Sequence, residues 1–389
     1  MPDALFLTPE TPYPHTGGGA LRIASLLEYF AQRYTVDVIT FREPGRQDPR
    51  CAFPLGIARH IHVIDLPYHH KDGASRIVRN VSRLVRRAPP LIDRFAGFAP
   101  AISTFIRDRQ YDIAVVEHFW CAPYWRDLAP QAKTTVLDLI DVESVLHERC
   151  ARAEAWPVGF AHLWFSKCYR KMEQEWFPRF DVLLATSQCD VERIRNISPG
   201  PRIVVYPNAL PAAALPRKME ENVVAFSGNL EFHPNVQAIR YFRAEIWPLL
   251  RDRWPQLIWR LIGKNPEAVQ KYTNGDVRIQ ITGPVSDAID ELAASKVVVV
   301  PLLAGSGTRV KILEAWAAGR AVVSTHVGAE GLPARHGENL LLADDPVRFA
   351  DSVSSVLASP QLQERLGRAG RVVFESEFTW HAAWSRLDL

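Results

Sequence analysis

The chain has 389 residues, of which 47% are hydrophobic and 23% charged; this is the composition of a globular protein, and the length favours two domains over one core. A formal net charge of +3 excludes the strongly basic balance of nucleic-acid-binding proteins, and we expect no nucleic-acid partner, no membrane-spanning segment and no secretory signal. The five cysteines are scattered without metal-ligand spacing, so we expect reduced thiols, a cytoplasmic location and no bound metal.

The first segment has the pattern of a Rossmann unit. A strand is predicted over 4–8 and a helix over 20–33, and the loop between them ends in Gly17, Gly18 and Gly19. These glycines do not follow the GxGxxG spacing, so a dinucleotide is not the expected ligand. Three consecutive glycines either let the backbone approach an anionic ligand closely or form a tight turn that binds nothing.

Arginines recur at helical spacing on one side of the segment 73–98, and apolar residues recur on another side. The arginines are Arg76, Arg79, Arg83 and Arg86, and the apolar residues are Ile77, Val81 and Leu84. This pattern predicts a basic amphipathic helix that ends at Pro89-Pro90. Its basic face is either simply solvated or attached to anionic lipid at a membrane surface.

Polar side chains follow two strands predicted at 112–117 and 135–140. The first strand ends in Glu117, and His118 and an aromatic cluster that includes Trp120 come next; Asp141 follows the second strand. Ligands of open α/β sheets gather at the carboxyl ends of the strands. Asp141 is therefore either functional or the cap of the next helix. His118 is either functional or a satisfied structural histidine.

The first domain is predicted to end at residue 207, where the proline- and alanine-rich linker 208–218 begins. We expect a second domain over 219–374 and a final helix over 375–389. Strands predicted at 223–227, 258–263 and 279–283 each lead into glycine or polar residues. These residues are Gly228 and Asn229 after the first strand, Lys264 after the second, and Gly283 and Val285 at the third.

The stretch 301–332 carries the strongest local pattern. A valine-rich strand, a loop from Gly305 to Thr308 and a helix over 309–318 follow one another. Free N–H groups and the helix dipole make such a helix start an anion site, and Arg309 and Lys311 add two cations there. Glu314, one turn on among apolar neighbours, needs hydrogen-bond donors, which sugar hydroxyls can supply. A structural N-cap loop is the alternative reading.

This stretch carries a resemblance to a known family. GSGTRVKILEAWAAGRAVVSTHVGAEGL resembles the donor-binding segment of family 4 retaining glycosyltransferases, and SGNLEFHPN and LIDVES resemble two further segments of that family. The resemblance extends over nearly the whole chain. It implies the GT-B fold, in which two Rossmann-like parallel-sheet domains face each other across a cleft. It also implies that the final helix returns to the first domain.

The resemblance implies a role for each candidate residue. Glu314 would hold the ribose of a nucleotide, whereas Arg309 and Lys311 would hold its diphosphate and offset the charge that develops there. Asp141 would act on the donor sugar and the acceptor, and Ser306 stands where the family often has a glutamate. The other donor-binding candidates are Gly17, Gly18, Gly19, Gly228, Asn229, Lys264, Gly283, Val285, Gly307 and Thr308. The acceptor-side candidates are Glu117, His118 and Trp120.

The function implied by the resemblance is a retaining, metal-independent transfer of a hexose-type sugar from a nucleoside diphosphate sugar. A UDP-sugar is favoured over a GDP-sugar, and the acceptor is a glycan, a lipid-linked precursor or a small molecule. We expect a cytoplasmic protein that acts at the inner face of the cytoplasmic membrane if the four arginines bind anionic lipid. Two other classes stay open: a sugar-nucleotide epimerase or isomerase, and a non-catalytic protein that only binds a nucleotide-sugar.

Overall fold

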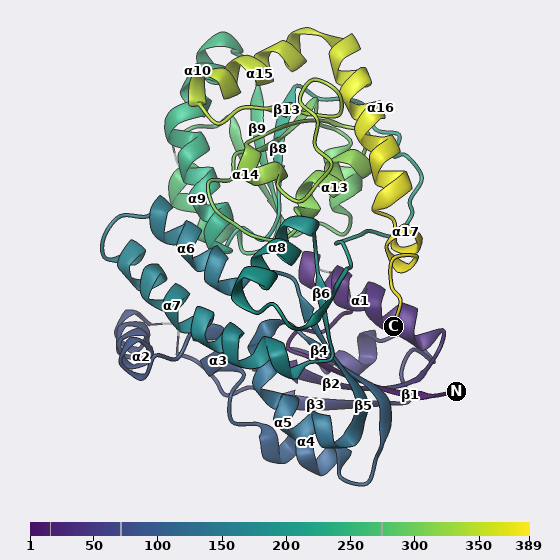
Figure 1. Cartoon of the computed structure of the whole chain (residues 1–389). Helices are drawn as coiled ribbons and strands as arrows, with labels where there is room; N and C mark the ends of the chain where they lie inside the picture. Colours follow the sequence, from purple (N-terminus) through teal and green to yellow (C-terminus); the bar gives the residue numbers. More distant parts are fainter. Residues whose placement is uncertain (16, 71, 274) are drawn as a thin grey trace. The chain divides into compact units, whose positions relative to one another are not determined.

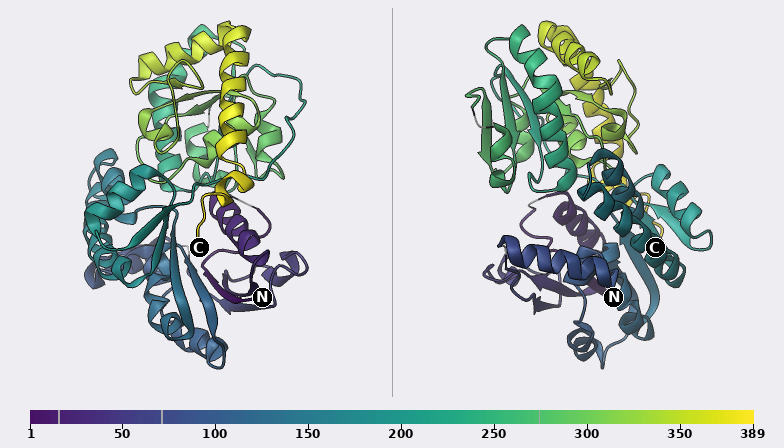
Figure 2. Two further views of the ribbon diagram at one scale, coloured as in Figure 1. Left: turned by 45° about the vertical axis from the view of Figure 1, so that its right-hand side comes forward. Right: turned by 90° about the vertical axis from the view of Figure 1, so that its left-hand side faces the viewer.

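The computed structural model describes residues 1–15, 17–70, 72–273 and 275–389, with Arg76 described by its backbone alone. The described chain divides into two compact units. The first unit contains Met1–Pro207 and Arg386–Leu389, and the second contains Asn208–Ser385, so both chain ends belong to the first unit (Figure 1). Helices flank the sheet of each unit (Figure 2). Among the described helices, none is both long and apolar enough to cross a bilayer.

The described residues of the first unit form a seven-stranded parallel sheet in the order β3-β2-β1-β4-β5-β6-β7. The strands β2 and β3 follow on one side of β1, and the chain then crosses to place β4 on the other side, so the strand order reverses between β1 and β4. Ligands of doubly wound sheets bind beyond the carboxyl ends of the strands at such a reversal. The strands are β1 (Asp3–Thr8), β2 (Thr35–Arg42), β3 (His60–Asp65), β4 (Tyr111–Glu117), β5 (Ala132–Leu139), β6 (Val182–Ala185) and β7 (Arg202–Val205).

Helices connect these strands, as the parallel order requires, and helices such as α1, α4 and α8 bury apolar side chains in the unit. The α-helices are α1 (Gly18–Ala31), α2 (Gly73–Arg86), α3 (Pro90–Arg94), α4 (Ala99–Ile106), α5 (Trp125–Leu128), α6 (Glu143–Ala153), α7 (Val158–Trp176) and α8 (Gln188–Ile197). Short 3-10 turns are η1 (Pro49–Ala52), η2 (Phe119–Tyr124), η3 (Ala129–Gln131) and η4 (Phe177–Arg179). The α6 and α7 helices pack on one another over most of their length.

The second unit repeats this design with a six-stranded parallel sheet in the order β10-β9-β8-β11-β12-β13, and its order reverses between β8 and β11. Its central strand β11 consists of four valines that are fully buried, as expected of a strand covered on both faces. The strands are β8 (Val223–Ser227), β9 (Ile258–Ile262), β10 (Ile279–Gly283), β11 (Val297–Val300), β12 (Ala321–Ser324) and β13 (Leu341–Leu342).

The helices of the second unit are α9 (His233–Tyr241), α10 (Trp247–Arg253), α11 (Gln270–Thr273), α12 (Ala288–Leu292), α13 (Val310–Ala317), α14 (His326–Ala329), α15 (Pro346–Ala358), α16 (Pro360–Glu377) and α17 (Trp380–Trp384). A short π-helix, η5 (Phe242–Ile246), joins α9 to α10, and a 3-10 turn, η6 (Pro266–Ala268), precedes α11. Together the two units have the GT-B architecture of two parallel-sheet α/β domains.

The end of the chain differs from the predicted boundary at residue 375, because α16 continues through it to Glu377. Gly370 packs so closely on Trp316 that a Cβ there would lie 2.1 Å from the indole Cδ1 atom, and the guanidinium of Arg371 donates to the carbonyls of Ala213 and Ala317. These contacts hold α16 in the second unit. The segment that joins the first unit is therefore only Arg386–Leu389.

The predicted basic helix is α2, which stops before Pro89-Pro90 as expected, but its surroundings differ from expectation. Asp93 of α3 accepts a hydrogen bond from Arg83 at 2.8 Å and pairs with Arg86 at 2.9 Å. Arg83 is consequently buried, whereas Arg86 stays exposed, so the arginine side of α2 is only partly solvated. The apolar side of the helix is exposed as well, at Ile77 and Val81. The Arg76 side chain, predicted to belong to this basic face, lies outside the described part of the structure.

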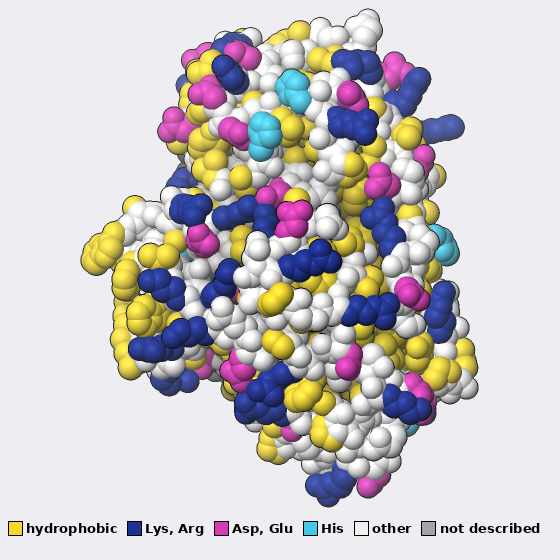
Figure 3. All heavy atoms as spheres, viewed as in Figure 1, with side chains coloured by type: hydrophobic (Ala, Val, Ile, Leu, Met, Phe, Trp, Pro, Cys, Tyr) yellow, Lys and Arg dark blue, Asp and Glu magenta, His cyan; other side chains and the backbone are white. Residues whose placement is uncertain are grey.

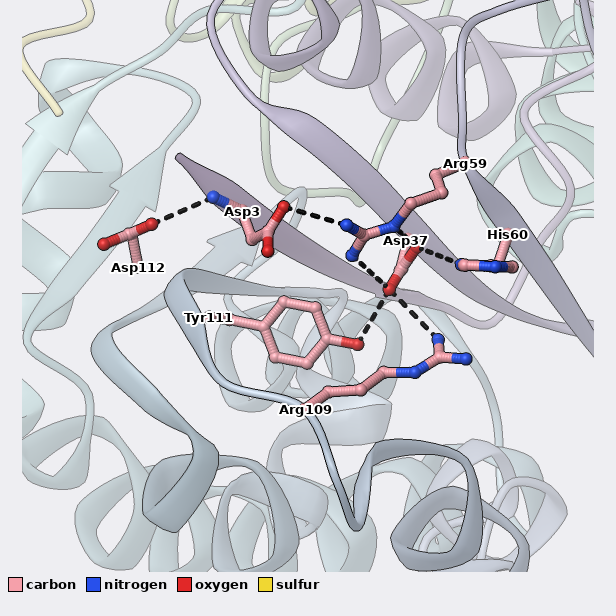
Figure 4. A network of polar contacts seen from close by, with 7 residues as sticks. All are labelled: Asp3, Asp37, Arg59, His60, Arg109, Tyr111 and Asp112. Carbon is pink, nitrogen blue, oxygen red and sulfur yellow. Dashed lines mark hydrogen bonds and ion pairs between the residues drawn. The ribbon is translucent and has the colours of Figure 1, made fainter. Parts of the chain in front are cut away.

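A polar network closes the amino end of the first sheet, opposite the edge where ligands are expected (Figure 4). The buried carboxylate of Asp37 in β2 accepts hydrogen bonds from Arg59, Arg109 and the Tyr111 hydroxyl, all at 2.9–3.0 Å, and His60 lies at 2.9 Å. Burial alone would raise the pKa of Asp37, but these hydrogen bonds outweigh it and hold the pKa below its usual value.

Candidate functional site

The second unit gathers most of the predicted donor residues at the reversal of its strand order. The loop after β8 contains Gly228 and Asn229, and the loop after β11 leads into α13. Gly228 has φ 139°, and a Cβ on the neighbouring Gly263 would lie 1.8 Å from the Gly228 carbonyl oxygen. Only glycines allow the ends of β8 and β9 to approach this closely. This edge of the sheet is thus lined by bare backbone.

The start of α13 lies at this edge. The loop from Gly305 to Thr308 is buried, and Gly305 and Gly307 both have positive φ values, 145° and 71°. The helix begins at Val310, and the side chain of its N-cap residue, Arg309, forms no capping hydrogen bond. The first N–H groups of a helix have no partner within the helix, and they carry the positive end of its dipole. The backbone here favours an anionic ligand.

Lys311, a half-buried residue, adds an ammonium group to this helix start. Its Nζ donates to Asn235 Oδ1 at 3.0 Å, lies 5.2 Å from the centre of the Phe226 ring and comes within 3.4 Å of the position that a Cβ on Gly228 would occupy. Within the described part of the chain it forms no salt bridge. Burial, and then the charge of Arg309, lower the pKa of Lys311 to about 8. A bound anion would relieve both effects.

Glu314 lies one turn further along α13. Its Oε2 accepts a hydrogen bond from the Ser227 hydroxyl at 2.8 Å, which links the end of β8 to the helix. Burial raises the pKa of this carboxyl above its ordinary value, although the Ser227 hydrogen bond and the charge of Lys311 partly offset the effect. Lys311 and Glu314 thus present one cation and one acceptor at the same edge.

Arg309 does not project from the first turn in the way the sequence suggested. Its guanidinium folds back under the loop, where it donates to the carbonyl of Ser306 and lies 3.5 Å from the carbonyl oxygen of Val327. A Cβ on Gly305 would lie 2.6 Å from it, so the glycine makes room for the arginine. Arg309 therefore shapes the loop and adds its charge from behind.

The remaining donor candidates lie around the same edge through backbone contacts. Lys264 accepts from the N–H of Leu230 at 3.0 Å, Gly283 accepts from Gly263 at 3.0 Å, and Thr308 accepts from the Asn208 side chain at 2.9 Å, each through its carbonyl oxygen. Asn229 accepts at its Oδ1 from Asn265 at 3.0 Å. Val285 is half-buried in the loop after β10. These contacts fix the shape of the loops.

The first unit forms a second candidate site at its own strand reversal, between β1 and β4. Gly18 and Gly19 open α1, and Gly17 is its N-cap with φ 148°. A Cβ on Gly19 would lie 2.9 Å from Glu10 Oε2 and 3.7 Å from His118 Nε2, so the start of α1 lies directly beside these side chains. The predicted glycines and His118 are therefore neighbours.

His118 has two features typical of functional residues. Its backbone has φ 61°, an uncommon conformation for a side chain with a Cβ. Its Nε2 atom is buried and has no hydrogen-bond partner among the described residues. Burial lowers the pKa of the imidazole, which keeps the ring neutral at pH 7. A neutral imidazole can form one hydrogen bond to a polar ligand through this nitrogen.

Glu117 does not belong to the ligand-facing surface, contrary to its assignment to the acceptor side. Its carboxyl is fully buried next to Asp138 of β5, and Asp138 pairs with the buried Arg22 at 2.5 Å. Burial, and then the charge of Asp138, raise the pKa of Glu117 well above its ordinary value. Glu117 and Asp138 are opposite one another in the β4–β5 register, so their side chains lie on the same face of the sheet, and both are fully buried there. The signal in the sequence was a charge inside an otherwise apolar strand, VLDL.

Asp141 and Trp120 lie near the same carboxyl ends. Asp141 is half-buried in the loop between β5 and α6, and Trp120 stacks on His118 with ring centroids 4.3 Å apart. Two acids that the sequence did not single out for a role, Glu143 and Glu173, are buried behind them. The site residues of the first unit therefore rest on a buried acidic layer.

The comparisons with known proteins follow this division. Residues 16–214 match the family described as Glycosyltransferase Family 4, and residues 221–359 match the family described as Glycosyl transferases group 1. The chain belongs to glycosyltransferase family 4. This glycosyltransferase is 23% identical over 376 residues to an uncharacterised 44.6 kDa protein in the cps region of Klebsiella pneumoniae, which covers 91% of this chain and 90% of the relative.

Other relatives of the glycosyltransferase agree. D-inositol 3-phosphate glycosyltransferase from Corynebacterium efficiens is 27% identical over 255 residues, 57% of this chain and 59% of the relative. Sucrose-phosphate synthase from Thermosynechococcus elongatus has the same fold, with a TM-score of 0.75 at 17% identity, over 99% of this chain and 97% of the other. Anabaena HepE in complex with UDP and glucose gives a TM-score of 0.70 at 16% identity, over 99% and 98% of the two chains.

Proposed function

We propose that this glycosyltransferase transfers a hexose-type sugar from a nucleoside diphosphate sugar, a UDP-sugar ahead of a GDP-sugar, with retention of configuration and without a metal. The observation that carries the proposal is Lys311, a half-buried cation with a lowered pKa at the start of α13. Glu314 beside it supplies the acceptor that a ribose needs. The complexes of HepE with UDP and glucose and with UDP-glucose support a UDP-sugar as the donor.

In this reaction the second unit binds the nucleotide. Lys311, the N–H groups that begin α13 and the backbone of Gly228 hold the diphosphate, and Glu314 accepts from the ribose hydroxyls. The bond between the anomeric carbon and the phosphate oxygen breaks, and a new bond forms to an acceptor oxygen on the same face of the sugar. The acceptor proton passes to the departing phosphate. Lys311 and the helix dipole stabilise the negative charge that develops there, and Arg309 supports them from behind the loop.

The first unit serves the sugar and the acceptor. The neutral imidazole of His118 has a buried nitrogen available for a hydroxyl group, and the Gly17–Gly19 backbone lies beside it. Asp141 orients the acceptor or stabilises the cationic character of the sugar in the transition state. Asp141→Asn is expected to lower turnover on the order of 100-fold while nucleotide binding stays nearly unchanged.

A product assay separates the three open classes. The protein is incubated with UDP-, GDP-, ADP- and dTDP-sugars, with and without glycan and lipid-linked acceptors, in the presence of a chelator. A transferase forms an α- or β-linked product that retains the donor configuration and depends on acceptor. Release of an altered sugar nucleotide without acceptor would indicate an epimerase or isomerase. Binding without any product would indicate a non-catalytic protein.

The acceptor is proposed to be a polysaccharide precursor presented at an anionic membrane surface. The relative in the cps region supports polysaccharide biosynthesis. An exposed surface of the first unit supports the proposal of membrane attachment, although it differs from the arginine face that the sequence suggested. We call it the α2–α7 apolar surface, and its exposed residues are Ile77, Val78, Val81 and Val85 of α2, Trp156 before α7, and Val158, Phe160 and Leu163 of α7.

These side chains form one surface because α2 and α7 are in contact. The Trp164 indole of α7 donates to the Leu84 carbonyl oxygen of α2 at 3.2 Å, and Arg87 lies over the same indole ring. The four apolar residues of α2 are 53–78% exposed and Trp156 is 84% exposed. Figure 3 shows apolar side chains with Lys and Arg side chains beside them on the side where Figure 1 labels α2 and α7.

The charge around this surface fits anionic lipid better than a neutral partner. Residues 73–86 and 158–172 contain no acidic residue, whereas Arg79 and Arg86 lie on α2 and Lys167 on α7. Basic residues near an anionic bilayer contribute about 1 kcal/mol each, and inserted apolar side chains add to this. The protein is therefore proposed to attach weakly and reversibly, in a salt-sensitive manner.

Vesicle co-sedimentation tests this attachment. Vesicles of phosphatidylcholine alone and with phosphatidylglycerol are compared at 0.15 M and 1 M salt, where the Debye length falls from about 8 Å to about 3 Å. A variant with serine at Ile77, Val81 and Val85 should lose binding, and glutamine at Arg79 and Arg86 should weaken it. Serine at Val277 and Val372, exposed in the second unit, is the control. Equal binding to both vesicle types, or by all variants, would favour an acceptor in solution.

A further inference from the structure

A group of buried polar side chains lies behind His118 and Asp141, and the reaction proposed above gives it no role. It belongs entirely to the first unit. Trp120 comes from η2, Glu143 and Ser144 from the start of α6, and Tyr169 and Glu173 from α7. All of these except the half-buried Trp120 are buried. Such a cluster is costly unless its groups are hydrogen-bonded, so its bonding shows what it holds in place.

Trp120 connects Glu143 to His118. The indole ring stacks on the imidazole of His118 with ring centroids 4.3 Å apart and planes 12° from parallel. The same ring stacks on Phe95 at 5.9 Å. Its Nε1–H donates to Glu143 Oε1 at 2.5 Å. The Glu143 carboxyl thus fixes the rotation of the indole, and the indole supports the plane of the imidazole.

Glu173 holds the start of α6 in a similar way. Its carboxyl accepts from the Ser144 N–H at 2.9 Å and from the Ser144 hydroxyl at 2.5 Å, and the Ser166 hydroxyl donates to the Ser144 carbonyl oxygen at 2.9 Å. The first N–H groups of a helix need a partner from outside the helix, and here α7 supplies it. Because α6 begins two residues after Asp141, this contact fixes the segment that carries Asp141.

The charged groups around Glu143 are mostly acidic. Asp141 acts on it from the preceding loop and Glu173 from α7, while Tyr169 of α7 adds a hydroxyl that has no hydrogen-bond partner among the described residues. His147 lies against Tyr169, with ring centroids 5.0 Å apart. Two cations act on this group from outside: Arg170 on Glu173 and Arg83 of α2 on Tyr169.

This environment favours uncharged acids. Burial, and then the charge of Asp141, raise the pKa of Glu143 to about 8. Burial raises the pKa of Glu173 to about 7, although the hydrogen bonds from Ser144 oppose it. At neutral pH Glu143 is therefore protonated. Its ionisation at alkaline pH adds a negative charge to a cluster that already contains other acids.

We propose that Glu143 and Glu173 are positioning residues of the transferase: Glu143 orients His118 through Trp120, and Glu173 fixes the segment that carries Asp141. The inference rests on the proposed function, since it matters for catalysis only where His118 and Asp141 serve the transfer. It adds a control by pH, because loss of the Glu143 proton strengthens the hydrogen bond from the Trp120 indole and places a negative charge beside Asp141 and Glu173, which changes how Trp120 supports His118.

Substitution of Glu143 tests the proposal through the pH profile. Glu143→Gln keeps an oxygen that accepts from the Trp120 indole, and it cannot ionise. At saturating donor, the wild-type turnover is expected to fall about tenfold from pH 7 to pH 9, whereas the Gln variant stays within about threefold. Glu143→Ala should lose about tenfold in turnover at pH 7 with nucleotide affinity unchanged. Glu148→Gln, whose carboxylate pairs with Arg152 on the surface of α6, is the matched control.

The indole N–H resonance of Trp120, assigned with Trp120→Phe, gives a readout that needs no substrate. It should shift with an apparent pKa near 8 in the wild type and stay constant in Glu143→Gln. An alkaline fall in turnover that persists in the Gln variant, or full turnover in Glu143→Ala, overturns the proposal. Where the Ala variant does not fold, the Gln profile decides. If the Trp120 resonance titrates but the protein transfers no sugar, the proposed function is refuted, whereas the hydrogen bond between Glu143 and Trp120 is confirmed.

Discussion

At the scale of single residues, the charges at the start of α13 explain why an anion belongs there. Lys311 is half-buried and donates to the neutral Asn235, and both the charge of Arg309 and the helix dipole disfavour its positive charge. A diphosphate reverses this balance, because it brings opposite charge to the ammonium and to the free N–H groups at once. Glu314 then has the ribose hydroxyls as donors besides Ser227.

The pH dependence of nucleotide binding follows from Lys311. Its pKa is about 8 in the free protein, and a bound diphosphate raises it. The cation that binds is therefore fully present below pH 8, and affinity is expected to fall by up to about tenfold per pH unit above it. Calorimetry of UDP binding in buffers with different ionisation enthalpies measures the proton taken up. Lys311→Gln should bind weakly and lose this decline; an identical decline in that variant would assign it to another group.

At the scale of elements, the two ends of the first sheet have different tasks. The carboxyl ends carry His118 and Asp141, while the amino ends are closed by the network around Asp37. The same contrast explains α2: Asp93 draws Arg83 inward, and the apolar side of the helix is left exposed. Helical periodicity identified two faces of α2, but it could not tell which one α3 would cover.

The Asp37 network makes a prediction about stability. Asp37→Ala leaves Arg59, His60, Arg109 and Tyr111 without their shared acceptor; because the first three are partly exposed and can be hydrated, the expected cost is about 1–3 kcal/mol. Urea unfolding followed by circular dichroism should show a lower midpoint. Asp108→Ala, an exposed aspartate near the same edge, is the control and should unfold like the wild type. Equal midpoints for all three proteins would mean that the network adds nothing to the free energy of unfolding.

Because the Asp37 pKa is lowered, its contribution is present above the unfolded-state pKa near 3.8 and is lost as the pH falls through the lower folded-state value. The difference in unfolding free energy between the wild type and Asp37→Ala should therefore shrink at acidic pH. A constant difference from pH 7 down to the acid limit of the fold would contradict the assignment of this stability to the ionised carboxylate.

At the scale of the whole molecule, the sequence predicted the fold better than the surroundings of the side chains. Valine-rich strands that alternate with helical periodicity predicted the parallel α/β sheets. The strands at 223–227 and 279–283 have the predicted bounds. Local pattern could not reveal that Arg22 reaches Asp138 across 116 residues, that Glu173 caps α6, or that Arg309 folds under its own loop. These contacts depend on packing between distant segments, whereas Lys311 and Glu314 were found because they share one helix.

The central claim is that a nucleoside diphosphate binds at Lys311 and Glu314. It is tested most directly by calorimetric titration of UDP and GDP into the wild type, Lys311→Gln, Glu314→Ala and the control Lys271→Gln, whose lysine is exposed on α11. Each charge-assisted contact contributes roughly 1.5–3 kcal/mol, so each site variant is expected to bind at least about tenfold more weakly, with UDP ahead of GDP in the wild type. The control should bind like the wild type. Unchanged affinity in folded Lys311→Gln and Glu314→Ala would contradict the account.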